Sequence, residues 1–241
     1  MEIGILGADG FLGQALCKQF PDAVQITKGN YEEYRGDTFD VFINANGNSR
    51  KFWAEQNPNE DFYKSTASVM DTFMNFNIKH YVYISSTDVY GETVYGFHKR
   101  LAERIVKKHA DSYLILRCCA LIGDGMRKGV VKDLIDGDPL WVRADSKMQF
   151  ITTSEVAKAI KIYIASREFN VTIDIHGEGY ITVKEISEIF GVSYSERDNV
   201  VSQHSRIVPT HYVPYVRDLF TAKTSKQYIE EFAYARMDKP L

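Results

Sequence analysis

Short apolar runs alternate with longer segments in which apolar residues recur at helical spacing over the first half of the chain. The apolar runs lie at 2–6, 23–26, 39–45 and 81–84, and the helical segments lie at 11–20, at 59–76 and from 95 onward. Strands buried on both faces read as continuous apolar runs, so this alternation predicts a parallel sheet with helices on both sides. We therefore expect an α/β fold with a Rossmann-type doubly wound parallel sheet.

The second half of the chain is more polar, and its pattern predicts fewer elements. We expect residues 123–143 to leave the sheet, 153–167 to return as a helix and 171–175 to add a strand. Residues 228–234 have the pattern of an amphipathic helix that packs rather than catalyses. At 241 residues the chain can bury one substantial core, so we expect a single unit with a small C-terminal lobe.

Three glycines follow the first apolar run with the spacing G-x-x-G-x-x-G. Gly7 permits a sharp exit from the strand, Gly10 lets the backbone approach a pyrophosphate, and Gly13 allows close packing of the next helix, whose N-terminus attracts anions. An ordinary turn is the alternative, but the position in the first strand–helix unit favours a dinucleotide. The residues assigned to this cofactor site are Gly7, Asp9, Gly10, Phe11, Leu12 and Gly13.

The end of the second apolar run bears on the choice between NAD and NADP. An acidic side chain there would bind the ribose 2′-OH of NAD, but the run ends in Thr27 and Lys28. A hydroxyl and an ammonium suit a 2′-phosphate, and Arg50 and Lys51 are further candidates. A solvated lysine in a turn is the alternative, so NADP is slightly favoured over NAD.

Polar residues follow the third apolar run at Asn44, Ala45, Asn46 and Gly47. Ligands of doubly wound sheets bind at the carboxyl ends of the strands, so we assign Asn44, Ala45 and Asn46 to the cofactor site. An ordinary Asn/Gly loop is the alternative interpretation.

The fourth apolar run ends in Ser85 and Ser86, and a helix is expected to begin near Tyr95. Tyr95 and Lys99 are four residues apart, so on a helix they share one face. A free tyrosine titrates too high for acid–base work, but a nearby ammonium and a positive nicotinamide ring stabilise the phenolate. We assign catalysis to Ser86, Tyr95 and Lys99, against the alternative of a packed tyrosine beside a surface lysine.

In this combination the chain resembles an extended short-chain dehydrogenase/reductase of the NAD-dependent epimerase/dehydratase family. The matching motifs are the three glycines, 44–47, 85–91, 95–99 followed by Ala102 and Glu103, Leu116 with Arg117, 149–157 and 178–185. Members mostly transform nucleotide-linked sugars, so the resemblance implies a small-molecule nucleotide-sugar substrate. On this basis the cofactor site also takes Ser85, Tyr95, Lys99 and Cys118.

The expected substrate site consists of Ser86, Thr87, Asp88 and Arg143. Guanidinium groups match phosphate oxygens, so Arg143, Arg206 and Arg217 are candidates to hold a nucleotide diphosphate. Solvated surface arginines are the alternative for each of them. The division that follows is a dinucleotide-binding core at 1–120 and 150–176, with a substrate-binding lobe at 121–149 and 177–241.

The chain departs from the family pattern at several points. Ser86 and Tyr95 are nine positions apart, without the longer insertion of relatives, which predicts an open substrate pocket. Residues 64–68 replace the family's Asn-led helix start. Met148 and Gln149 stand where the family has Arg-Asp, and Ser154 and Glu155 where it has Asp-Asp.

The favoured reaction is reduction of a keto-sugar, because the short segment between Thr27 and Phe39 resembles the sugar 4-ketoreductases. The alternative is an NAD-dependent nucleotide-sugar epimerase that retains its cofactor. A 4,6-dehydratase is disfavoured because Thr87 occupies the first position of its acidic pair and only Asp88 remains. That ranking weakens if Thr87 is the catalytic hydroxyl. A non-catalytic NAD(P)-binding sensor is the third hypothesis, although a sensor needs no phenolic acid.

Composition agrees with an enzyme of this kind. The chain is 44% hydrophobic with a net charge of −3, so we expect neither a nucleic-acid surface nor a membrane partner. Its three cysteines and six histidines lack metal-ligand spacing. No targeting segment is recognisable, which favours the cytoplasm. The family resemblance implies a possible homodimer.

Overall fold

The computed structural model describes residues 1–204 and 223–237. The chain divides into two compact units, which are described separately. The first consists of Met1–Cys118 and Ala157–Asp174, and the second of Cys119–Val156 and Ile175–Leu241.

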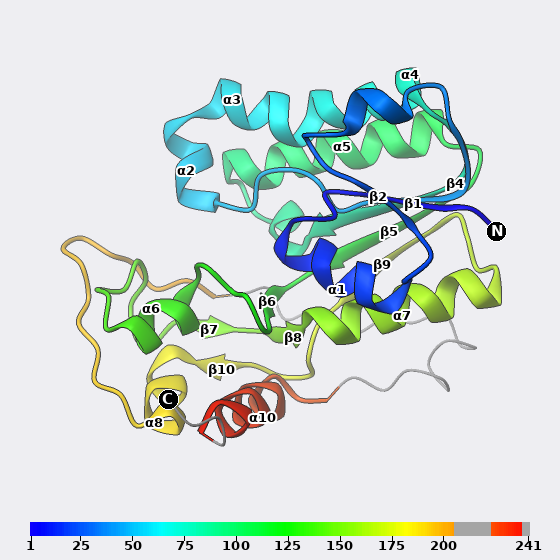
Figure 1. Ribbon diagram of the computed structural model, residues 1–241. Helices are drawn as coiled ribbons and strands as arrows, with labels where there is room; N and C mark the ends of the chain where they lie inside the picture. Colours follow the sequence, from blue (N-terminus) through cyan, green and yellow to red (C-terminus); the bar gives the residue numbers. More distant parts are fainter. Residues whose placement is uncertain (205–222, 238–241) are drawn as a thin grey trace. The chain divides into compact units, whose positions relative to one another are not determined.

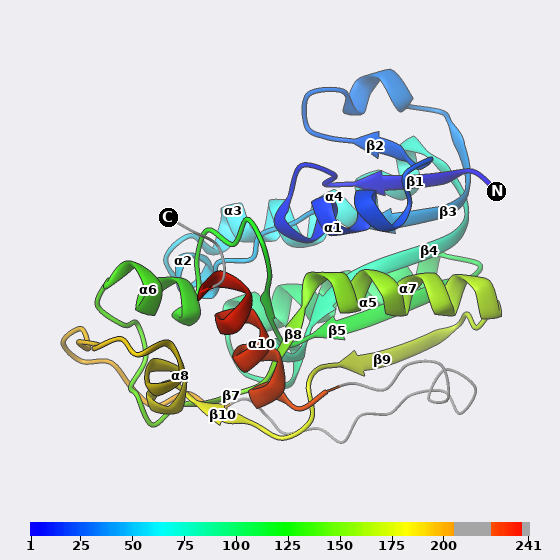
Figure 2. The same ribbon diagram turned by 60° about the horizontal axis from the view of Figure 1, so that its bottom comes forward.

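A six-stranded sheet forms the centre of the first unit, in the order β2-β1-β3-β4-β5-β9 (Figure 2). The strands are β1 (Ile3–Leu6), β2 (Val24–Ile26), β3 (Thr38–Asn44), β4 (Asn77–Ser86), β5 (Tyr113–Cys118) and β9 (Val171–Ile175). The pairs from β2 to β5 are parallel. This sheet confirms the predicted fold class, and each strand predicted from an apolar run is present.

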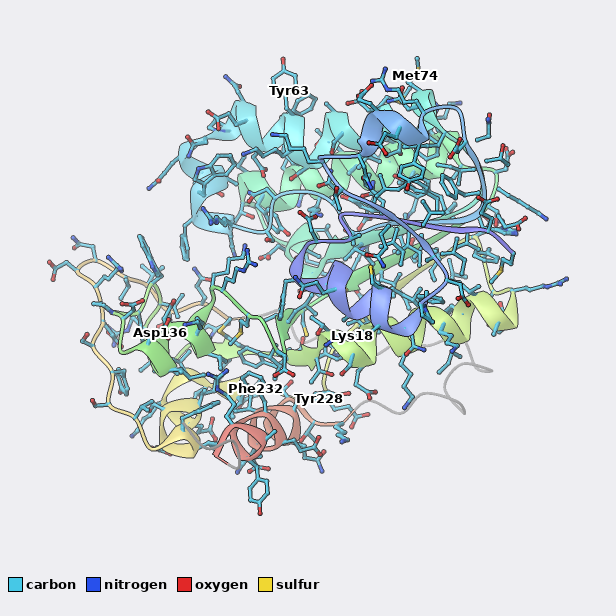
Figure 3. The ribbon with its side chains drawn as sticks, viewed as in Figure 1. Lys18, Tyr63, Met74, Asp136, Tyr228 and Phe232 are labelled. Carbon is cyan, nitrogen blue, oxygen red and sulfur yellow. The ribbon has the colours of Figure 1, made fainter. Side chains whose placement is uncertain are left out.

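Helices cover both faces of this sheet (Figure 1). On one face lie α1 (Phe11–Gln19) and α7 (Thr153–Ser166). On the other lie α2 (Lys51–Gln56), α3 (Pro58–Phe62), the π-helical turn η2 (Tyr63–Ala67), α4 (Ser68–Asn75) and α5 (Val94–His109). The helix predicted at 59–76 is therefore interrupted by a π turn, and α2 was not predicted. Tyr63 and Met74 point away from this layer (Figure 3).

Aromatic side chains fill the core between the sheet and the α4–α5 layer. The Phe42 ring lies 5.0 Å from Phe76 and 5.8 Å from Tyr81, and Phe73 stacks on Tyr81 at 4.6 Å. The buried Tyr81 hydroxyl has partners in Thr72 at 2.8 Å and in the amide of Asn44 at 2.7 Å. The core thus tethers the end of β3 through a satisfied polar contact.

The chain changes direction between β1 and β3. It leaves β1 for β2 on one side, passes through the short 3-10 helix η1 (Tyr31–Tyr34), and returns as β3 on the other side. The carboxyl ends of β1 and β3 therefore form a topological switch point, where ligands of such sheets bind.

The described part of the second unit contains two small sheets and the helices α6 (Val130–Asp136), α8 (Val183–Phe190) and α10 (Ser225–Met237). β6 (Ala120–Ile122) runs parallel to β8 (Phe150–Thr152), and β7 (Lys147–Met148) is antiparallel to β10 (Ile181–Thr182). The expected tail helix lies within α10, where Tyr228 and Phe232 are buried (Figure 3). A Thr182–Glu185 capping box starts α8.

Gly13→Ala is predicted to lower the free energy of unfolding by at least about 2 kcal/mol, because a Cβ there would lie 1.9 Å from the carbonyl oxygen of Gly7. Gly29→Ala is the matched control, since its Cβ would meet nothing closer than Thr27 Oγ1 at 3.7 Å. Urea denaturation followed by circular dichroism measures both. Equal stability of the two variants would contradict the close contact.

Candidate active site

The glycine turn joins β1 to α1 at the switch point. Gly7 has a φ of +82°, a conformation that favours glycine, and its N–H donates to Ile26 O at 2.9 Å. The N–H of Gly10 then donates to Gly7 O at 2.9 Å, and α1 begins at Phe11. No side chain of the described residues caps α1, so the N–H groups of its first turn are available to an anion. Leu12 and Gly13 are buried, whereas Asp9 is exposed.

The loop after β3 lies beside this turn. A Cβ on Gly7 would be 3.0 Å from the backbone nitrogen of Asn46 and 3.1 Å from the carbonyl carbon of Ala45. The buried Asn44 accepts from the N–H of Asn46 at 3.0 Å while its amide donates to Tyr81. The structure thus brings Gly7, Ala45 and Asn46 together, and it places the Asn44 side chain inside the fold as a brace for the loop.

At the end of β2, Thr27 is held in a local turn. Its backbone N–H and its hydroxyl both bond to Asn30 Oδ1, at 2.7 and 3.1 Å. Lys28 is exposed, and no carboxylate of residues 1–204 or 223–237 pairs with it. Of the further candidates, Arg50 is exposed and Lys51 donates to Asp88 Oδ1 at 2.8 Å. Lys28 is therefore an exposed cation directly after β2, and Arg50, also exposed, follows β3.

Ser86, Tyr95 and Lys99 converge at the carboxyl end of β4. The 3-10 helix η3 (Thr87–Tyr90) follows Ser86, and Thr93 caps the N-terminus of α5 by accepting from the N–H of Gly96 at 3.1 Å. A Cβ on Gly96 would lie 2.1 Å from Asp88 O, so glycine lets α5 begin directly against η3. This close contact brings Tyr95 near Ser86, whose hydroxyl donates to Asp88 Oδ2 at 3.2 Å.

Lys99 lies beneath these residues. Its Nζ donates to Ile84 O at 3.1 Å and lies 5.1 Å from the ring centroid of Tyr83 and 5.9 Å from that of Tyr95. A Cβ on Gly47 would be 3.7 Å from the same Nζ, which places the lysine beside the loop after β3. Lys99 and the loop after β3 thus lie side by side, and the same loop contacts the Gly7 turn.

Burial sets the protonation of this group. It lowers the pKa of Lys99 to about 8, although the charges of Cys118, Asp61 and Glu103 oppose the shift. Burial also raises the pKa of Tyr95 well above its ordinary value, with the Asp88 carboxylate adding to the rise and the bond to Ser86 opposing it. At neutral pH the lysine is charged and the tyrosine holds its proton. Burial raises the pKa of Cys118 to about 12, so its thiol stays neutral.

The predicted substrate residues fall in different places. Asp88 accepts from the Ser86 hydroxyl at 3.2 Å and from Lys51, while Thr87 is partly exposed beside it. Arg143 belongs to the second unit, where it is exposed and its Nε lies 3.6 Å from Asp145 Oδ1. Arg206 and Arg217 lie outside the described residues.

A polar chain beneath the site was missed by the sequence reasoning. Ser85, expected at the cofactor, donates to Glu103 at 2.6 Å, and Glu103 forms a two-point ion pair with Arg117 at 2.9 and 2.7 Å. Arg117 donates to Tyr90 Oη at 2.7 Å, which donates to Asp174. The sheet register places Ser85 opposite Arg117, and that pairing is the signal that could have revealed the chain.

The chain belongs to the NAD dependent epimerase/dehydratase family, which matches residues 3–173. No curated protein gives a significant match. Among residues 1–204 and 223–237, no helix has the length and apolar character needed to cross a bilayer. No cluster of three or more metal-ligating side chains occurs in the same residues.

Several solved structures share the fold. A dTDP-4-dehydrorhamnose reductase from Bacillus anthracis str. Ames in complex with NADP has a TM-score of 0.76 at 17% identity, covering 98% of this chain and 99% of that one. The reductase of the same name from Clostridium acetobutylicum ATCC 824 has a TM-score of 0.73 at 19% identity, covering 98% and 100%. UDP-N-acetylglucosamine 4-epimerase from Methanobrevibacter ruminantium M1 has a TM-score of 0.73 at 14% identity, covering 98% of both chains.

Glu103→Gln is predicted to lower the free energy of unfolding by about 3 kcal/mol, because it leaves the half-buried Arg117 without its carboxylate. Glu32→Gln is the control. It removes an exposed pair with Arg35 at 3.0 Å and should change stability by less than about 0.5 kcal/mol. Chemical denaturation measures the free energy of unfolding of both variants. An equal loss in the two would show that the buried Glu103–Arg117 pair stabilises the fold no more than the exposed pair does.

Proposed function

We propose that the protein is an NADPH-dependent reductase of a nucleotide-linked keto-sugar. The observation that carries the proposal is the convergence of Ser86, Tyr95 and Lys99 beside the loop after β3, next to the glycine turn. Family membership and the fold shared with nucleotide-sugar reductases and epimerases support it.

The residues present fit a dinucleotide. The uncapped start of α1 suits a pyrophosphate, and the Gly7 turn lies backbone to backbone against the loop after β3 at the switch point. NADPH, when bound, supplies the hydride that reduces the carbonyl carbon. A positive nicotinamide ring after transfer would favour the phenolate of Tyr95.

Each catalytic side chain then has a separate task. The Ser86 hydroxyl, which lies near Tyr95, orients the sugar carbonyl oxygen toward the phenol. Tyr95 is protonated at neutral pH and gives its proton to that oxygen. The Lys99 ammonium, fixed by Ile84 O, stabilises the phenolate that remains and can donate to the nicotinamide ribose.

Two features favour a reductase that uses NADPH over an epimerase that retains NAD⁺. The β2–β3 connection holds only the short helix η1, in agreement with the compact segment expected of sugar 4-ketoreductases. The exposed Lys28 at the end of β2 supplies a positive charge where an NAD site would carry a carboxylate.

The direct experiment mixes the purified protein with NADPH and a panel of nucleotide-linked 4-keto-sugars and follows NADPH oxidation. Mass spectrometry of the protein as purified shows whether a cofactor has been retained through purification. Turnover with exchangeable NADPH supports the reductase. Tightly retained NAD⁺ with interconversion of sugar epimers would replace it with an epimerase, and cofactor binding without any turnover would favour a sensor.

Tyr95→Phe is predicted to reduce kcat by about 10²–10⁴-fold, because it removes the proton donor and preserves the ring. The Kd for NADPH should change by less than about threefold, since the substitution keeps the aromatic ring and removes only one hydroxyl. Steady-state kinetics and a fluorescence titration give the two values. A fully active variant would exclude Tyr95 as the acid.

Lys28→Ala is predicted to weaken NADPH binding about tenfold and to leave NADH binding unchanged, because only NADPH carries the 2′-phosphate. Lys18→Ala is the matched control, since this exposed lysine lies in the last turn of α1 (Figure 3). Fluorescence titration with both cofactors measures the ratio. Equal weakening for NADPH and NADH would place the 2′-phosphate elsewhere.

A further inference from the structure

A fully buried carboxylate lies on the helical side of the site. Asp61 of α3 has 0% exposure, and its Oδ2 lies 2.7 Å from Nδ1 of the buried His98. Its Oδ1 accepts from Asn48 Nδ2 at 2.7 Å and from Ser65 Oγ at 3.1 Å. An acid in such a place is rare unless it is paired and hydrogen-bonded, and nothing in the chemistry above uses it.

Two partners of this carboxylate, His98 and Ser65, lie next to Lys99 or beside the loop that Lys99 meets. His98, its partner, directly precedes Lys99 on α5. A Cβ on Gly47 would be 3.7 Å from Lys99 Nζ and 3.9 Å from the Cα of Ser65, a second partner of Asp61. The π turn η2 carries Ser65 toward this point, and π turns are frequent at functional sites.

We propose that Asp61 is a positioning residue for the Tyr95–Lys99 pair: held by His98, Asn48 and Ser65, it supplies the fixed negative charge that keeps Lys99 protonated. The inference rests on the proposed function for its catalytic meaning. The effect of the Asp61 charge on Lys99 does not depend on any substrate or cofactor.

The sign of the effect follows from the groups that face Lys99. Burial lowers its pKa, and Cys118 on β5, Asp61 on α3 and Glu103 on α5 act in the opposite direction. Glu103 is paired with Arg117, and the Cys118 thiol is uncharged at neutral pH, which leaves Asp61 as the carboxylate of this group that no lysine or arginine of the described residues pairs with. Asp61 also adds to the raised pKa of Tyr95, after burial and Asp88. Removing its charge therefore lowers the pKa of both groups.

The test replaces Asp61 by Asn and titrates Lys99 in protein with ¹³C-labelled lysine, using Lys99→Arg to assign the signal by nuclear magnetic resonance. The pKa of Lys99 is expected to fall by about one unit, and the alkaline limb of kcat/KM should move to lower pH by a similar amount. Asp71→Asn, which removes the same charge from an exposed position of α4, is the control and should shift neither value. An unchanged Lys99 titration in Asp61→Asn, or an equal shift in Asp71→Asn, would overturn the proposal.

If Asp61→Asn does not fold, the double variant Asp61→Asn/His98→Asn provides the same test, because two amides can hydrogen-bond to each other. The resonance readout requires no substrate. A shifted Lys99 signal without turnover on any keto-sugar would reject the proposed function and leave the Asp61 charge effect standing. Turnover with an unshifted Lys99 signal would support the proposed function and reject the Asp61 charge effect.

Discussion

The close approach of α1 to the end of β1 is the contact on which the rest of the candidate site depends. Gly13 leaves no room for a Cβ against Gly7 O, so the first turn of α1 is fixed directly above the strand end. Gly7 in turn lies against the backbone of Ala45 and Asn46. One backbone-to-backbone contact thereby aligns the open N–H groups of a helix with the edge where β1 and β3 diverge.

A second close contact, between Gly96 and Asp88 O, fixes the start of α5, which carries Tyr95 and Lys99, against η3. It places Tyr95 beside Ser86 and buries Lys99 under both. Burial lowers the pKa of the lysine, and charges on neighbouring elements oppose that shift. Glu103 of α5 links Ser85 at the end of β4 to Arg117 of β5, and the Asp61 charge is among those that raise the pKa of Lys99.

The sequence predicted the sheet and its edge well, because buried parallel strands and glycine turns leave local signals. The β1–α1 turn, the end of β4 and the Tyr95–Lys99 helix face could all be inferred from spacing. The π turn at Tyr63–Ala67 and the short helix α2 could not, because tertiary contacts override helical periodicity there. The Asp61–His98 pair joins residues 37 positions apart, and local sequence patterns cannot predict a contact over that separation.

The most direct measurement is a fluorescence titration of the purified protein with NADPH. The account predicts saturable binding that is competed by NADP⁺ and is tighter than the binding of NADH. Absence of binding to either reduced cofactor, with the protein folded by circular dichroism, would contradict the assignment of the β1–β3 edge as a dinucleotide site.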